Sequence, residues 1–132
     1  MEALPVLSLE GRKALVVGGA GGGIGSAITY SLAQAGAHVS VITNDTSHAD
    51  SIHSEAKERG HEIHCYIKDV TDLKAFTTTV DDVIAANGSF HHLVNVVGGA
   101  EVRDWSRAKD YELEMFDRII TRNLRYALVT VS

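Results

Sequence analysis

Residues 14–25 read Ala-Leu-Val-Val-Gly-Gly-Ala-Gly-Gly-Gly-Ile-Gly, a short apolar run that leads directly into a loop made almost entirely of glycine. Residues 26–35 carry a helical pattern, and Gly36 follows at the place where glycine commonly ends a helix. A strand, a glycine loop and a helix in this order bring free backbone amides and the positive end of a helix dipole to one point. The stretch therefore predicts a site for a diphosphate.

Three glycines of this loop have the spacing G-x3-G-x-G, and each is expected to do a different job. Gly19 turns the chain off the strand, Gly23 leaves room for the diphosphate at bare backbone, and Gly25 lets the helix pack close to the sheet. A merely flexible turn is the alternative, but the flanking strand and helix favour nucleotide binding. No Gly-Lys-Ser/Thr follows, which excludes a Walker-type phosphate loop.

Hydrophobic periodicity alternates between strands and helices along the chain. Strands are predicted at residues 13–17, 38–42, 62–67 and 92–97, and a helix follows each of them, the last beginning near Asp110. This order predicts an α/β fold, a Rossmann-type doubly wound parallel sheet with strand order 3-2-1-4. We expect residues 1–132 to form a single NAD(P)-binding domain.

Apolar spacing also predicts which side of each helix faces the sheet. The first helix is expected to bury Ile24, Ala27, Ile28, Leu32 and Ala35, and the last helix Leu113, Phe116, Ile120, Leu124, Ala127 and Val131. Asp45, Thr46 or Ser47 is expected to cap the second helix, and Thr71 the third.

The amino-acid composition limits the binding partners, the cellular location and the metal sites that can be expected. The net charge of −5 gives no reason to expect nucleic acid or an anionic membrane as a partner. One cysteine, Cys65, cannot form an internal disulfide, which indicates a reducing, cytoplasmic location. The seven histidines lack the spacing of a zinc site, so surface positions are expected and no metal site is predicted.

The chain resembles the short-chain dehydrogenase/reductase family over residues 9–132. Four patches in the family's order carry this resemblance: the loop 18–25, Asp69-Val70, the run Asn95-Val96-Val97-Gly98, and Asn123 within Arg-Asn-Leu. The resemblance implies an enzyme that transfers hydride between a nicotinamide and a small alcohol or carbonyl substrate, with NAD or NADP as cofactor.

The same resemblance implies the residues of the site. Asp69 and Val70 would contact the adenine, and Asn123 matches the asparagine of the family's catalytic tetrad. The implied cofactor-binding residues are Gly19, Gly22, Gly23, Ile24, Gly25, Thr43, Asn44, Asp69, Val70, Asn95, Val96 and Gly98. Gly18 replaces the family's threonine and two valines replace its Asn-Ala, so we expect packing to hold the loop more than side-chain hydrogen bonds do.

The family's remaining catalytic residues are not in this sequence. The family uses a serine after the fifth strand and a Tyr-x3-Lys on the next helix, and none of Tyr30, Tyr66, Tyr111 and Tyr126 has a lysine four residues later. We therefore expect the cofactor-binding half of a dehydrogenase, truncated before its fifth strand, inactive alone and homo-oligomeric when complete. The alternative is a non-catalytic nucleotide-binding module, or a subunit completed by another chain.

The choice between NAD and NADP depends on the end of the second strand. Dehydrogenases that use NAD place an acidic residue there, against the ribose 2′-hydroxyl. Here Thr43 and Asn44 occupy that place and Asp45 comes two residues later, while neither Gly22 nor Asn44 supplies a cation for a 2′-phosphate. The balance favours NAD by a small margin.

Two features of the last helix have ordinary structural interpretations. Asn123 shares a face with Phe116 and Ile120, so the residues alone favour a core asparagine bonded to nearby backbone. The resemblance adds a role in positioning a water and the active-site lysine. Arg118, Arg122 and Arg125 are expected to line a solvated face with ion pairs to Glu114 and Asp117, an oligomer interface being the alternative.

Overall fold

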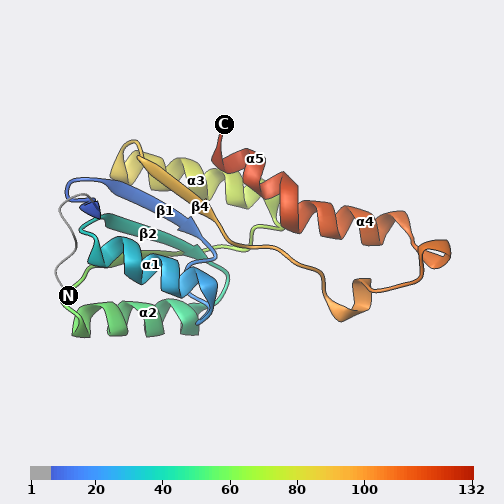
Figure 1. Ribbon diagram of the computed structural model, residues 1–132. Helices are drawn as coiled ribbons and strands as arrows, with labels where there is room; N and C mark the ends of the chain where they lie inside the picture. The colour runs from blue at the N-terminus through green and yellow to red at the C-terminus, as the bar shows by residue number, and fades with distance from the viewer. Residues whose placement is uncertain (1–6) are drawn as a thin grey trace.

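Strand β1 (Lys13–Val17) lies inside the sheet and pairs in parallel with β2 (His38–Thr43) on one side and β4 (His92–Asn95) on the other. Strand β3 (Ile63–Ile67) pairs with β2, which gives the order β3-β2-β1-β4 and confirms the predicted topology (Figure 1). The computed structural model describes residues 7–132, so the first six residues of the expected domain lie outside it.

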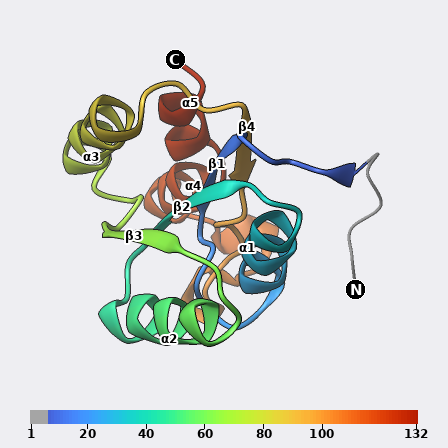
Figure 2. The same cartoon turned by 90° about the vertical axis from the view of Figure 1, so that its left-hand side faces the viewer.

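The helices cover both faces of the sheet, as Figure 2 shows. Helices α1 and α2 lie on one face, and α3 and α5 lie on the other, with α4 continuing beyond the sheet. Their bounds are α1 (Ile24–Gln34), α2 (Thr46–Glu58), α3 (Leu73–Asn87), α4 (Leu113–Ile120) and α5 (Tyr126–Thr130). Residues Thr121–Arg125 form a π-helical turn between α4 and α5, so 113–130 is one continuous helix.

No helix within residues 7–132 has the length and apolarity to cross a membrane.

The alternation of side chains along β1 divides the core into two layers. Ala14 and Val16 are fully buried and pack against α1 and α2, whereas Leu15 and Val17 pack against α3 and α5. A strand buried on both faces explains why its sequence is a continuous apolar run.

Helix α1 buries a different face from the one that its large apolar residues predict. Its buried residues are Gly25, Ser26, Thr29 and Ala33, while Ile24 is 75% exposed. Small side chains face the sheet because the helix approaches the end of β1 closely. Ile24 is exposed because α1 begins beyond the carboxyl ends of the strands. The predicted inward positions of Ile24 and Ala27 are therefore wrong, since both residues are exposed.

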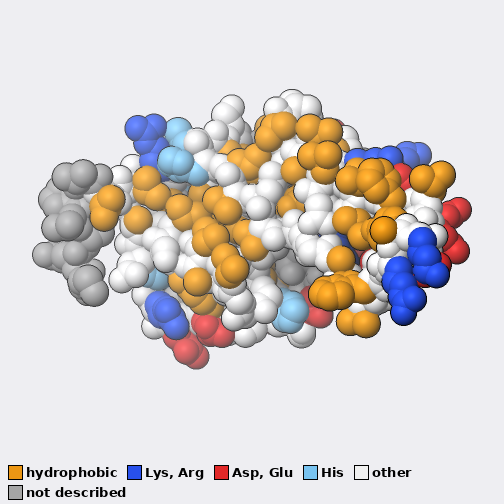
Figure 3. Space-filling view, turned by 45° about the vertical axis from the view of Figure 1, so that its right-hand side comes forward, with side chains coloured by type: hydrophobic (Ala, Val, Ile, Leu, Met, Phe, Trp, Pro, Cys, Tyr) orange, Lys and Arg blue, Asp and Glu red, His pale blue; other side chains and the backbone are white. Residues whose placement is uncertain are grey.

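The segment after β4 and helix α4 form an arm that extends away from the sheet (Figure 1). It contains two short 3-10 turns, Val102–Asp104 and Ala108–Asp110, before α4 begins. Hydrophobic side chains are exposed across this end of the molecule (Figure 3). The predicted inward face of the last helix is wrong at Leu113, Phe116, Leu124 and Val131, which are 50–79% exposed, because α4 has no sheet beneath it.

The residue that anchors the last helix is instead Tyr126, which is 1% exposed. Its ring packs edge-on against Phe76 of α3, with the ring centroids 6.0 Å apart. Its hydroxyl donates a hydrogen bond to the carbonyl oxygen of Val97, 2.7 Å away. One buried tyrosine thus fixes α5 both to α3 and to the end of β4.

The caps of α2 and α3 are both aspartates. Asp45 caps α2, as expected, and accepts hydrogen bonds from the amides of Ser47 and His48. Asp72 caps α3 by accepting from the amide of Ala75, so the expected cap at Thr71 is wrong. The hydroxyl of Thr71 is already donated to Asp69, two residues earlier.

The close packing of α1 gives a stability prediction. A Cβ added to Gly25 would lie 2.0 Å from the carbonyl oxygen of Gly18, closer than any two such atoms can approach. Gly25→Ala is expected to lower the free energy of unfolding by more than about 2 kcal/mol, because backbone on both sides must move. In the control, Gly21→Ala, the new Cβ would lie an ordinary 4.0 Å from His48 Nδ1. Chemical denaturation checks both variants, and equal stability would contradict the argument.

Candidate nucleotide-binding site

The glycine loop turns at Gly18 and Gly22, whose φ angles of +90° and +76° favour glycine. Gly19 serves a different purpose from the expected sharp turn. A Cβ there would lie 2.6 Å from Thr29 Oγ1 and 2.9 Å from Val16 Cγ1, so Gly19 is small because the first helix and the strand enclose it.

Two hydroxyl groups on α1 hold the loop in shape. Ser26 Oγ accepts a hydrogen bond from the amide of Gly22 at 2.8 Å, and Thr29 Oγ1 donates to the carbonyl oxygen of Gly19 at 3.0 Å. Packing also contributes, because a Cβ on Gly18 would lie 2.8 Å from Val97 Cγ2. Side-chain hydrogen bonds therefore do hold the loop, and they come from the helix rather than from the loop itself. The four-residue spacing of Gly22 and Ser26 could have indicated the first of them.

Access to the start of α1 is open at Gly23. No atom lies within 4 Å of a Cβ built on Gly23, and the side chain of Ile24 points into solvent. The first amides of α1 lack partners within the helix, and the helix dipole makes this end positive. An anion can therefore reach these amides without displacing a side chain.

Residues that follow β2 and β3 form a small hollow beside the loop. Thr43, Asn44, Asp69 and Val70 line this hollow of about 60 Å³ together with Gly18. Val70 is buried, and Asp69 Oδ1 accepts hydrogen bonds from the amide and the hydroxyl of Thr71 at 2.8 and 2.7 Å. These bonds lower the pKa of Asp69, which keeps its carboxylate charged and fixed.

Lys68 and Arg122 also line this hollow, and the sequence patterns did not single them out for the site. Lys68 could have been suspected because it directly precedes Asp69. Arg122 comes from the distant last helix, so local patterns give no signal for it.

The residues at the end of β4 connect the sheet to the last helix. Asn95 Nδ2 donates a hydrogen bond to Thr130 Oγ1 at 3.0 Å, so this side chain engages α5. Val96 donates its amide to the carbonyl oxygen of Val17 at 2.9 Å, which continues the pairing beyond the end of the strand. A Cβ on Gly98 would lie 2.8 Å from Asn123 Oδ1, so Gly98 is small because Asn123 approaches it.

Asn123 lies in the π-helical turn and binds backbone on two sides. Its Nδ2 donates to the carbonyl oxygens of Gly99 and Ile119 at 2.9 and 2.8 Å, and its Oδ1 accepts from the amide of Gly99 at 2.7 Å. The expected backbone hydrogen bonds are present, but the side chain is exposed rather than in the core. Single π-helical turns inside α-helices are frequent at functional sites.

Two arginines of the last helix reach across to the segment after β4. Arg118 donates from Nε and Nη2 to Asp104 Oδ1, at 3.0 and 2.7 Å, and Arg122 Nη2 lies 3.0 Å from Glu101 Oε1. The expected solvated face therefore applies only to Arg125, which lies 3.5 Å from Asp117. The Arg118 guanidinium beside Asp104 holds the pKa of the Asp104 carboxyl below its usual range. These pairs border a cavity of about 410 Å³ that also contains Asp69 and Gly99.

All the predicted cofactor residues lie at one edge of the sheet. They follow the carboxyl ends of β1, β2, β3 and β4, which meet at the same edge because the strands are parallel. Asn123 joins this edge through Gly99. Within residues 7–132, no group of three or more His, Cys, Asp or Glu side chains is placed to share a metal ion.

The sequence of residues 13–132 matches the family model described as short chain dehydrogenase. The chain belongs to the short-chain dehydrogenase family. Its relatives include elsinochrome reductase 1 of Elsinoe fawcettii, 34% identical over 95% of this chain and 46% of that protein. Versicolorin reductase of Emericella nidulans is 35% identical over 89% of this chain and 43% of that protein.

Solved structures agree with this assignment. A citronellol catabolism dehydrogenase of Pseudomonas aeruginosa PAO1 superposes with a TM-score of 0.82 at 27% identity, covering 98% of this chain and 51% of that one. A short-chain dehydrogenase/reductase of Serratia marcescens also gives 0.82 at 27% identity, covering 93% and 49%. The chain thus spans about half the length of the family members that it matches.

The Asp104–Arg118 pair gives a pH prediction. A carboxyl whose pKa is lowered in the folded state contributes stability that is present above its unfolded pKa of about 3.9, and this contribution is lost as the pH falls through the folded pKa. Asp104→Asn is therefore expected to be less stable than the wild type at pH 6, with the difference shrinking below about pH 4. Urea denaturation across this range checks it, with Asp81→Asn on the exposed face of α3 as the control. A difference that stays constant with pH would contradict this account.

Proposed function

We propose that the whole protein is an NAD(P)-dependent oxidoreductase and that this chain binds the cofactor. The observation that carries the proposal is the open start of α1, where Gly23 leaves the amides clear and Gly25 brings the helix against the end of β1. The diphosphate would bind at Gly19, Gly22, Gly23, Ile24 and Gly25, and the adenine beside Asp69 and Val70. The ribose would lie near Thr43 and Asn44, with Asn95, Val96 and Gly98 completing that side.

The reaction would move a hydride between the nicotinamide and the carbon of an alcohol or carbonyl group. The names of the matched relatives favour carbonyl reduction, because several are reductases. In that direction the bound cofactor supplies the hydride and the carbonyl oxygen gains a proton. Asn123 would support the proton transfer by fixing the backbone at Gly99.

Tyr126 and Tyr30 are poorly suited to donate that proton. The hydroxyl of Tyr126 is donated to Val97, and burial raises its pKa. Burial and the carboxylate of Glu55 raise the pKa of Tyr30 to about 12. We therefore propose that this chain alone binds cofactor without turning over substrate, and that the whole protein acts in the cytoplasm as a homo-oligomer.

The first test concerns the open backbone at Gly23. Gly23→Leu adds a side chain where the diphosphate would lie, and the affinity for NADH is expected to fall at least about tenfold while the fold is kept. Calorimetric titration measures it in the whole protein, and Ala86→Leu on the exposed face of α3 is the matched control. Unchanged affinity in Gly23→Leu would reject the proposed cofactor site.

The second test separates an enzyme from a binding module. Residues 1–132 alone are expected to bind NADH, read by quenching of the single tryptophan, Trp105, and to oxidise none of it with carbonyl substrates. The whole protein should bind and also turn over. Binding without turnover in the whole protein would favour the non-catalytic module.

A further inference from the structure

The acid that follows the end of β2 serves as the N-cap of α2. Asp45 is the nearest acid in sequence, and its Oδ1 accepts from the amide of Ser47 at 2.8 Å, from the amide of His48 at 3.2 Å and from the hydroxyl of Ser47. These bonds lower the pKa of Asp45 and hold its Oδ1 at the start of α2. Thr43 is buried and Asn44 is a neutral amide.

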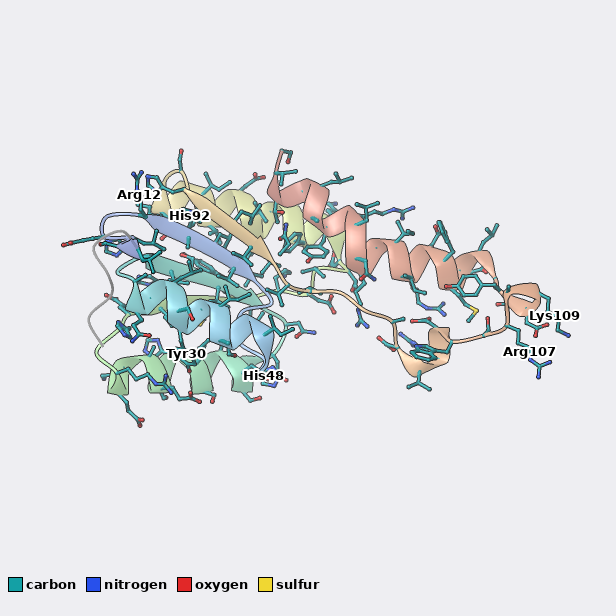
Figure 4. All side chains as sticks on the ribbon, viewed as in Figure 1. Arg12, Tyr30, His48, His92, Arg107 and Lys109 are labelled. Carbon is teal, nitrogen blue, oxygen red and sulfur yellow. The ribbon has the colours of Figure 1, made fainter. Side chains whose placement is uncertain are left out.

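A histidine stands beside the glycine loop at the same edge of the sheet. His48 lies in the first turn of α2, and its Nδ1 is 4.0 Å from the position of a Cβ on Gly21. Figure 4 shows His48 at the end of α2 that adjoins the loop between β1 and α1. Parallel strands bring these segments together, because α1 and α2 both begin at the carboxyl edge of the sheet.

His48 and two loop glycines share one hollow. Gly21, Gly22 and His48 line a space of about 340 Å³ between the starts of α1 and α2. Glu55 also lines it, but its carboxylate accepts hydrogen bonds from Tyr30 at 2.7 Å and Ser51 at 3.2 Å. Gly22 has no side chain to fill the opening, and no atom lies within 4 Å of a Cβ built there.

We propose that His48 selects NADP over NAD by donating a hydrogen bond to the 2′-phosphate of the adenosine ribose. The inference rests on the proposed cofactor site, and it reverses the small margin for NAD that the sequence gives. The ribose 2′ position of a bound dinucleotide lies at the end of β2, where an acid accepts the hydroxyl of NAD or a cation accommodates the phosphate of NADP. Here the acid caps a helix through Oδ1, and an imidazole, whose ring N–H can donate a hydrogen bond, lines the hollow.

The test measures how tightly the whole protein binds two cofactors and two smaller molecules that correspond to parts of them. The wild type is expected to bind NADPH at least about tenfold more tightly than NADH, and adenosine 2′,5′-bisphosphate more tightly than 5′-AMP, since a charge-assisted hydrogen bond is gained. His48→Ala should remove most of the NADPH preference and change NADH affinity less than about twofold. His48→Arg should keep the preference, and Asn44→Asp should weaken NADPH binding by placing a free carboxylate at the 2′ position.

The control is His64→Ala, which removes an exposed imidazole from β3 and should leave both affinities unchanged. Equal NADPH and NADH affinities in the wild type, or a NADPH preference that survives in His48→Ala, would overturn the role of His48 while leaving the cofactor site intact. Failure of the wild type to bind either dinucleotide would instead reject the proposed function itself.

Discussion

The site depends on one close approach, that of helix α1 to the end of strand β1. The α-carbon of Gly25 lies so near the carbonyl oxygen of Gly18 that a Cβ would be only 2.0 Å away from that oxygen. This approach points the first amides of α1 across the loop and toward the sheet edge, where the ends of the other strands converge. Ser26 and Thr29 then bond the loop back to the same helix, so the loop shape and the helix position are fixed together.

The topology could be predicted from the sequence because the signals for it are local. The strand order follows from the alternation of apolar runs and helical patterns, and the glycine spacing locates the loop. The helix faces could not be predicted in the same way. The buried side of α1 consists of Gly25, Ser26, Thr29 and Ala33, because a closely packed helix needs small side chains and apolar periodicity does not register them.

The prediction of the buried face of the last helix was wrong for the opposite reason. Its apolar stripe is strong, but the sheet does not extend beneath α4, so Leu113 and Phe116 remain exposed. Buried Tyr126 anchors the C-terminal part of this helix, and polar contacts hold the part before it. Asn123 binds Gly99, and Arg118 binds Asp104. The positions of these partners follow from the path of the segment after β4 (Figure 1). The candidate site residues carried by motifs could be named in advance, whereas Arg122 and His48 required the structure.

The proposed cofactor choice depends on the residue that caps α2. A carboxylate at this position accepts hydrogen bonds from the amides of the first helical turn. Asp45 accepts three hydrogen bonds at one oxygen, all from Ser47 and His48. These bonds hold that oxygen at the start of α2, and the same turn of the helix carries His48, whose Nδ1 lies 4.0 Å from the position of a Cβ on Gly21. In the proposed site, the acid that follows β2 therefore stabilises the helix, and the imidazole lies beside the glycine loop.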